Sequence, residues 1–122
     1  MLRALIIDDE SDIRKTLSDL IARHCPQVSL LGAVSCMEDG VNAIQTLHPD
    51  LVFLNIDRKN QTKIKLLCAV KSIEFKIIVI SACDKARIQA LKLSGIEYLL
   101  KPIQTTDLKI AVSRVRTTPI IN

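Results

Sequence analysis

Five short apolar segments alternate with amphipathic segments along the chain. The apolar segments predict strands at roughly 3–8, 28–34, 51–56, 76–81 and 97–100. The third and fourth of them are apolar without interruption, from Leu51 to Leu54 and from Ile77 to Ile80. Such uninterrupted stretches are typical of central strands in a parallel sheet that is covered on both faces.

The amphipathic segments have the periodicity of helices. Ser11 or Asp12 is expected to cap a first helix, and Ser35 with Glu38 has the spacing of a capping box for a second. Three further helices are predicted at about 62–72, at about 85–93 before a C-cap at Gly95, and after Asp107. The residues predicted to face the core from the first, second and fifth helices are Ile13, Leu17, Leu20 and Ile21, then Met37, Val41 and Ile44, then Leu108, Ala111, Val112 and Val115.

Strand–helix alternation repeated five times implies parallel βαβ units with right-handed crossovers. We therefore predict an α/β fold, a three-layer (βα)5 doubly wound sheet of five parallel strands. The chain has 122 residues, of which 48% are hydrophobic, and this is enough for one domain with its own core. We expect that domain to cover 1–122, with its core at about 1–116 and a tail or the start of a linker at 117–122.

Composition excludes several classes of protein. No apolar run approaches the roughly 20 residues of a membrane span, and the acids of Asp8-Asp9-Glu10 come too early for a signal peptide, so we expect a cytoplasmic protein without membrane contact. The net charge is +4, but the basic residues are scattered and the chain has one Tyr, two Phe and no Trp, so we expect no nucleic-acid contact. The four cysteines form no C-x-x-C pair and are expected to be buried, reduced thiols: Cys25, Cys36, Cys68 and Cys83.

Polar residues follow four of the predicted strands. They are Asp8-Asp9-Glu10, Asn55-Ile56-Asp57, Ser81 and Lys101-Pro102. In a doubly wound sheet the carboxyl ends of the strands gather beside the topological switch point, so we expect these groups to meet around Asn55. Vicinal carboxylates are hard oxygen ligands for Mg²⁺, and a lysine and a hydroxyl suit an anion beside it.

Four segments, in this order, resemble the receiver domain of two-component response regulators, a chemotaxis-receiver-like and flavodoxin-like fold. They are Leu5–Glu10, Pro49–Leu54, Ile80–Ala82 and Tyr98–Pro102, and the resemblance covers about residues 1–116. The second and fourth segments look most like receivers that precede LytTR-type DNA-binding domains. The resemblance implies the strand order 2-1-3-4-5 and a role in phosphorelay signal transduction.

The resemblance also implies a role for each polar residue at the strand ends. Asp8 and Asp9 would hold Mg²⁺ together with the main-chain carbonyl of Asp57, although a solvated loop explains Asp57 equally well. Ser81 would be the switch hydroxyl of the family, or simply the start of a turn. Lys101 would contact phosphoryl oxygens, and its bond to the following proline would be cis.

Asn55 departs from the family, which has its phosphoaccepting Asp at this position. A carboxylate oxygen takes the phosphoryl group as an acyl phosphate, whereas a neutral carboxamide is a far poorer nucleophile and cannot form that bond. The metal site also loses one of three negative charges, so we expect weaker Mg²⁺ binding. The loop Asp57–Lys63 lacks the family's Pro and Gly, which favours natural divergence over an engineered substitution. Because switching by Tyr98 in the family depends on phosphorylation, we interpret its ring as core packing.

We therefore predict a pseudo-receiver, not an enzyme, that signals through protein–protein contacts. Its partner would be a sensor histidine kinase, another signalling protein, or a second copy bound through the face of the fourth helix, fifth strand and fifth helix. The main alternative is a working phosphoacceptor receiver, in which Asn55 is an engineered substitution or Asp9 or Asp57 accepts instead. A flavodoxin-like nucleotide-binding or phosphatase domain is disfavoured, because the acids after the first strand repel a phosphate without metal and no glycine-rich phosphate loop is present.

Overall fold

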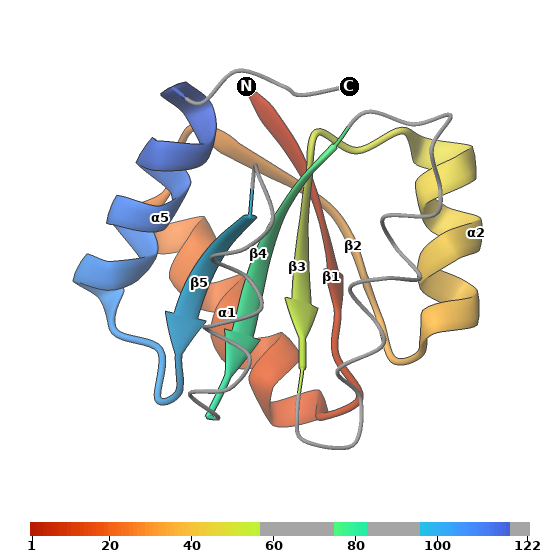
Figure 1. Cartoon of the computed structure of the whole chain (residues 1–122), viewed down its shortest axis with the longest axis horizontal. Helices are drawn as coiled ribbons and strands as arrows, with labels where there is room; N and C mark the ends of the chain where they lie inside the picture. The colour runs from red at the N-terminus through yellow and green to blue at the C-terminus, as the bar shows by residue number, and fades with distance from the viewer. Residues whose placement is uncertain (57–74, 83–95, 118–122) are drawn as a thin grey trace.

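One sheet of five parallel strands forms the centre of the computed structural model, which describes residues 1–56, 75–82 and 96–117 (Figure 1). The strands are β1 (Leu2–Ile7), β2 (Val28–Val34), β3 (Leu51–Asn55), β4 (Lys76–Ser81) and β5 (Ile96–Leu100). They pair in parallel in the order β2-β1-β3-β4-β5. The predicted fold class and strand order are confirmed, and each strand lies within about one residue of its predicted bounds.

The strands β3 and β4 are buried along their whole length, as their uninterrupted apolar pattern predicts. Phe53 of β3 pairs with Ile6 of β1 and Ile78 of β4, and the three side chains lie in one core. The next residue, Leu54, belongs to a second core on the opposite face of the sheet. Because successive side chains of a strand alternate between faces, a central strand needs apolar residues at every position when both faces are covered.

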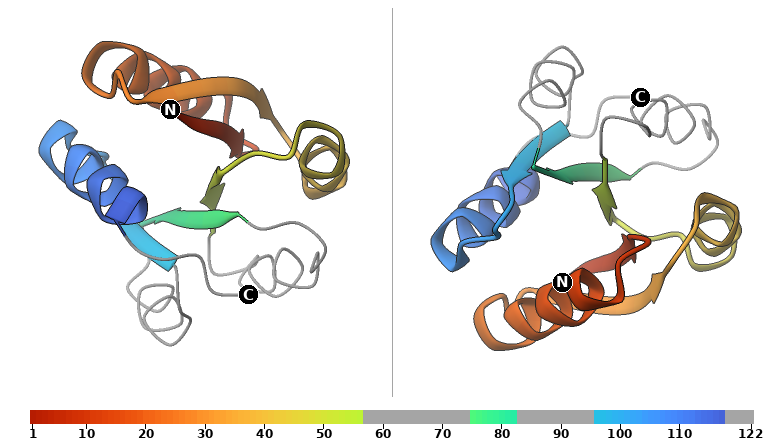
Figure 2. Two further views of the ribbon diagram at one scale, coloured as in Figure 1. Left: turned by 90° about the horizontal axis from the view of Figure 1, so that it is seen from above. Right: turned by 90° about the horizontal axis from the view of Figure 1, so that it is seen from below.

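Helices cover both faces of the sheet, as a three-layer fold requires. The helices α1 (Ser11–His24) and α5 (Thr105–Thr117) lie on one face, and α2 (Met37–Leu47) lies on the other (Figure 2). Their predicted core residues are buried or half-buried, and the buried ones are Leu17, Ile21, Ile44, Leu108, Ala111, Val112 and Val115. The third and fourth predicted helices, and the predicted C-cap at Gly95, fall outside the described residues. Within the described ranges, no helix is long and apolar enough to cross a membrane.

The predicted N-cap of the first helix is wrong. Glu10 stands at the N-cap position of α1, and no side chain caps the helix; Ser11 is already its first residue. The cause lies at the end of β1, where Asp8 Oδ1 accepts the backbone N–H of Glu10 at 2.8 Å. This contact turns the chain directly after the strand, so the helix starts before Ser11 or Asp12 can cap it.

The predicted capping box of the second helix is also wrong. Cys36 is the N-cap residue of α2, without a side-chain cap, and this places Glu38 at the second helical position instead of the third. The same register leaves the Cys36 thiol exposed, which contradicts the prediction that it is buried. Cys25 is buried as predicted, and burial raises the pKa of its thiol. The other two cysteines fall outside the described residues.

Candidate acidic pocket at the carboxyl ends of the strands

The polar residues at the strand ends gather at one edge of the sheet, as predicted. Asp8 follows β1, Asn55 ends β3, Ser81 ends β4 and Lys101 follows β5. Asp8, Asn55 and Ser81 are buried, whereas Asp9 is exposed. Because β1 lies between β2 and β3 in the sheet, the chain order reverses here, and this edge is the topological switch point where open α/β sheets bind their ligands.

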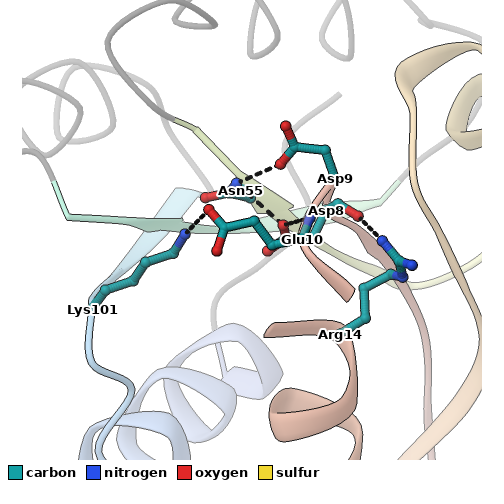
Figure 3. A network of polar contacts seen from close by, with 6 residues as sticks. All are labelled: Asp8, Asp9, Glu10, Arg14, Asn55 and Lys101. Carbon is teal, nitrogen blue, oxygen red and sulfur yellow. Dashed lines mark hydrogen bonds and ion pairs between the residues drawn. The ribbon is translucent and has the colours of Figure 1, made fainter. Parts of the chain in front are cut away.

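Asn55 lies against the two acids that follow β1. Its Nδ2 donates to Asp8 Oδ1 at 3.2 Å and to Asp9 Oδ1 at 3.3 Å (Figure 3). A carboxamide nitrogen carries two hydrogens, so it can serve both carboxylates at once. The structure therefore brings together three of the predicted site residues through direct contacts.

Asp8 is held at several of its atoms. Its Oδ1 accepts the Glu10 N–H as well as the Asn55 amide, and its main-chain oxygen accepts the Arg14 guanidinium at 2.7 Å. Its Oδ2 is buried and accepts no hydrogen bond from any described residue. Burial raises the pKa of the Asp8 carboxyl, and the Glu10 N–H and the positive charge of Lys101 partly offset that rise.

Lys101 approaches the pocket from the end of β5. Its Nζ lies 3.7 Å from Glu10 Oε1, and its side chain is 18% exposed. The main-chain carbonyl of Ser81 accepts two donors, the Lys101 N–H at 2.9 Å and the Tyr98 hydroxyl at 3.5 Å. The Tyr98 ring packs against the core on the α2 side of the sheet. The Lys101–Pro102 bond is cis, as predicted.

Glu10 and Arg14 are pocket residues to which sequence reasoning assigned no role. Glu10 pairs with Lys101, and Arg14 donates to the carbonyl of Asp8. A signal was available, because Glu10 directly follows the acidic pair and Arg14 lies one helical turn beyond it. Their side-chain directions, which decide the contacts, are set only in the folded chain.

The oxygen donors at this edge fit a hard divalent cation. Asp8 and Asp9 bring two carboxylates together, and the buried Asp8 Oδ2 is an acceptor that a cation would satisfy. In the part of the chain that the structure describes, no group of three or more His, Cys, Asp or Glu side chains is placed to hold a metal ion. The remaining predicted ligand, the carbonyl of Asp57, falls outside that part.

Comparison with known proteins gives consistent matches over nearly the whole chain. The family model described as the response regulator receiver domain matches residues 4–113. The chain is 34% identical to an uncharacterized response regulatory protein of Vibrio cholerae, over 94% of this chain and 48% of that protein. It is 30% identical to the sensory transduction protein LytT of Bacillus cereus, over 84% of this chain and 42% of LytT.

A solved structure shows the same similarity in three dimensions. The N-terminal domain of an uncharacterized protein from Wolinella succinogenes has a TM-score of 0.74 and 28% identity to this chain, over 95% of this chain and 94% of that domain. The chain spans about half the length of the curated relatives it matches. The predicted resemblance to receivers, including those of the LytT kind, is confirmed.

Proposed function

The chain belongs to the response regulator receiver domain family, and on that premise we propose that it signals without accepting a phosphoryl group. Receiver domains take part in two-component signalling, interact with histidine kinases and other signalling partners, and generally bind Mg²⁺ at their acidic pocket. In this proposal the chain is a cytoplasmic pseudo-receiver that is not an enzyme and acts through protein–protein contacts.

The residue at the end of β3 carries the proposal. Asn55 stands where the family has its phosphoaccepting Asp, and it is buried against Asp8. An acceptor carboxylate uses an oxygen lone pair to form an acyl phosphate. The carboxamide of Asn55 is neutral, its nitrogen lone pair is delocalised into the carbonyl, and its nitrogen hydrogens are directed at the two acids.

Asp8 and Asp9 are the residues that would hold Mg²⁺, with the carbonyl of Asp57. When bound, the ion supplies positive charge against the negative charge of a phosphoryl group. We expect its binding to be weaker than in an ordinary receiver, because Asn55 brings no charge to the site. Lys101 would hold anion oxygens, with Ser81 and Tyr98 in the switch positions of the family, but in this structure its amine is paired with an acid.

A surface for partner contact is proposed on β5 and α5, together with the fourth predicted helix. Leu100 on β5 and Ile110 on α5 are large apolar side chains with about half of their surface exposed. Lys109 and Arg114 line a shallow depression with Ile110, and Arg114 pairs with Glu97 at 3.7 Å. Apolar residues among mixed charges suit a signalling partner or a second copy of the chain.

An output half is part of the proposal for the whole protein. The relatives are about twice as long as this chain, and one of them is a sensory transduction protein of the LytT kind. A LytTR-type DNA-binding half would make the whole protein a transcriptional regulator. The receiver itself would then act on that half and make no nucleic-acid contact.

Intact mass spectrometry after incubation with acetyl phosphate and Mg²⁺ tests the proposal. The native chain is expected to keep its mass, because position 55 offers no carboxylate nucleophile. Asn55→Asp restores the nucleophile in place and is expected to gain one phosphoryl group that hydroxylamine removes. Asn42→Asp, at an exposed position on α2, is the matched control and should gain none.

A stable phosphoryl adduct on the native chain would overturn the proposal. Peptide mapping would then identify the acceptor. An adduct on Asp9, whose exposed side chain has Oδ1 3.3 Å from Asn55 Nδ2, or on Asp57 would make the protein a working receiver with a relocated acceptor.

A further inference from the structure

We infer that the Asn55 carboxamide takes the place of a bound cation and holds the acidic pocket in one arrangement without metal. The inference rests on the proposed function, because it explains how a receiver without an acceptor keeps its two acids together. Its consequence concerns regulation. The acids are held together before any Mg²⁺ binds, so the domain does not depend on the metal to order its acidic pocket.

The amide of Asn55 can face the acids in only one way. With Nδ2 toward them, it donates to Asp8 Oδ1 and Asp9 Oδ1. The reversed amide would bring its carbonyl oxygen against two carboxylate oxygens, which are acceptors too. Each carboxylate gives one oxygen to the same amide nitrogen, so the amide links the two acids without a metal ion between them.

The surroundings of the cross-link support it. Asn55 is 3% exposed and Asp8 is 1% exposed, so bulk water competes little for their contact. Glu10 donates its N–H to the same Asp8 oxygen, and Arg14 holds the Asp8 carbonyl. As Figure 3 shows, these contacts come from the turn after β1, the start of α1 and the end of β3. The amide therefore joins the end of β3 to the turn between β1 and α1.

The cross-link and Mg²⁺ compete for the same two acids. A cation between Asp8 and Asp9 would draw on carboxylates that already serve the hydrogens of the amide, and Asn55 offers it an oxygen only after the amide has turned over. Truncating the amide without changing the charge must therefore strengthen Mg²⁺ binding. The loss of a mere metal ligand would weaken binding, so the sign of the effect separates the two explanations.

Isothermal titration calorimetry with Mg²⁺ alone, at one pH and ionic strength, tests the inference on three forms of the chain. We expect affinity to rise from the native chain to Asn55→Ala to Asn55→Asp. The first step should be on the order of fivefold, because truncation frees two acids from hydrogen bonds, and the second should be larger, because it adds a charge. Equal or weaker Mg²⁺ binding by Asn55→Ala would overturn the inference.

A second measurement uses the native chain, in case Asn55→Ala disturbs the fold. The side-chain NH₂ signals of Asn55 in a ¹H–¹⁵N spectrum are identified by their absence from Asn55→Asp. Their exchange with solvent should be at least about tenfold slower than that of the exposed Asn42 amide, because buried hydrogen bonds protect them. Exchange as fast as that of Asn42 would overturn the inference.

The inference and the proposed function fail separately. If the amide exchanges fast and the native chain gains no phosphoryl group, the inferred cross-link is wrong and the proposed pseudo-receiver stands. If the native chain gains a phosphoryl group, the proposed pseudo-receiver is wrong, whatever the Mg²⁺ titration shows.

Discussion

The polar groups at the two edges of the sheet, where the strands begin (the amino edge) and where they end (the carboxyl edge), differ in how well they are paired. At the amino edge, the buried Lys76 donates from Nζ to the Val115 carbonyl in the last turn of α5, at 2.6 Å. Beside it, at a more exposed position, the Asp50 carboxylate accepts the Arg3 N–H at 2.9 Å. At the carboxyl edge, two acids lie side by side, and the buried Oδ2 of Asp8 accepts no hydrogen bond from the described residues.

The difference separates stability from function. A buried polar group with a matched partner supports the fold, whereas a buried carboxylate beside a second acid opposes it. Natural proteins keep such costly arrangements where the groups serve a site. We therefore interpret the amino edge as the structural edge of this sheet and propose the carboxyl edge as its functional edge.

Removal of the Lys76 amine at the amino edge should destabilise the fold more than the two changes described below. Lys76→Met keeps most of the aliphatic stem but leaves the Val115 carbonyl without its donor. We expect the free energy of unfolding in urea to fall by about 1.5–3 kcal/mol, the range for a hydrogen bond to a charged group. The control Lys15→Met, at an exposed site on α1, should change it by less than about 0.5 kcal/mol. If both variants unfold like the native chain, the amino edge is not held by its polar contacts.

Removal of the Asp50 carboxylate should have a smaller effect at the same edge. Asp50→Ala leaves the Arg3 N–H without its acceptor, and we expect a loss of about 1 kcal/mol in the free energy of unfolding. Asp50→Asn keeps an acceptor oxygen and should lose less. Equal losses in urea unfolding of the two variants would show that charge, and not the hydrogen bond, matters at this position.

Neutralising Asp8 should stabilise the fold instead of destabilising it, and this effect should be the smallest of the three. Burial raises the pKa of Asp8, so the folded chain binds this proton more tightly than the unfolded chain. As the pH rises above the ordinary aspartate value of 3.8, the unfolded chain loses the proton first, and stability falls. Asp8→Asn should therefore raise the melting temperature by about 2–4 °C at neutral pH, with no gain at low pH.

Calorimetric melting curves across the acid range check this sign. Asp9→Asn, at an exposed acid of the same pocket, is the control and should shift the melting temperature less. A lower melting temperature for Asp8→Asn at neutral pH would mean that the carboxyl edge stabilises the fold, and the contrast between the edges would be lost.

Most of the fold could be predicted from the sequence, because burial on two faces leaves a strong pattern. Leu51 to Leu54 has no polar position, and the structure buries every residue of β3. The meeting of Asp8 with Asn55 also follows, since parallel strands bring their carboxyl ends to one edge. These inferences need the parallel direction of the strands, which the alternation of strands and helices implies, and their order, which the resemblance to receiver domains implies.

The finer contacts depend on side-chain directions that no periodicity contains. The N-cap of α1 falls at Glu10 because the Asp8 carboxylate takes up its N–H, and the Cys36 thiol is exposed because α2 starts one residue late for the predicted box. The orientation of the Asn55 amide is set by two carboxylates from another strand end. A sequence names such groups, but only the folded chain shows which atoms face each other.

The absence of an acceptor carboxylate at the functional edge is tested most directly with beryllofluoride, a phosphoryl mimic that coordinates an aspartate oxygen. The measurement is the melting temperature with Mg²⁺, with and without beryllofluoride, for the native chain and Asn55→Asp. We predict a rise for Asn55→Asp, worth about 2.7 kcal/mol at a hundred times the dissociation constant, and none for the native chain. An equal rise for the native chain would contradict the pseudo-receiver, because a carboxylate other than residue 55 would then be the acceptor.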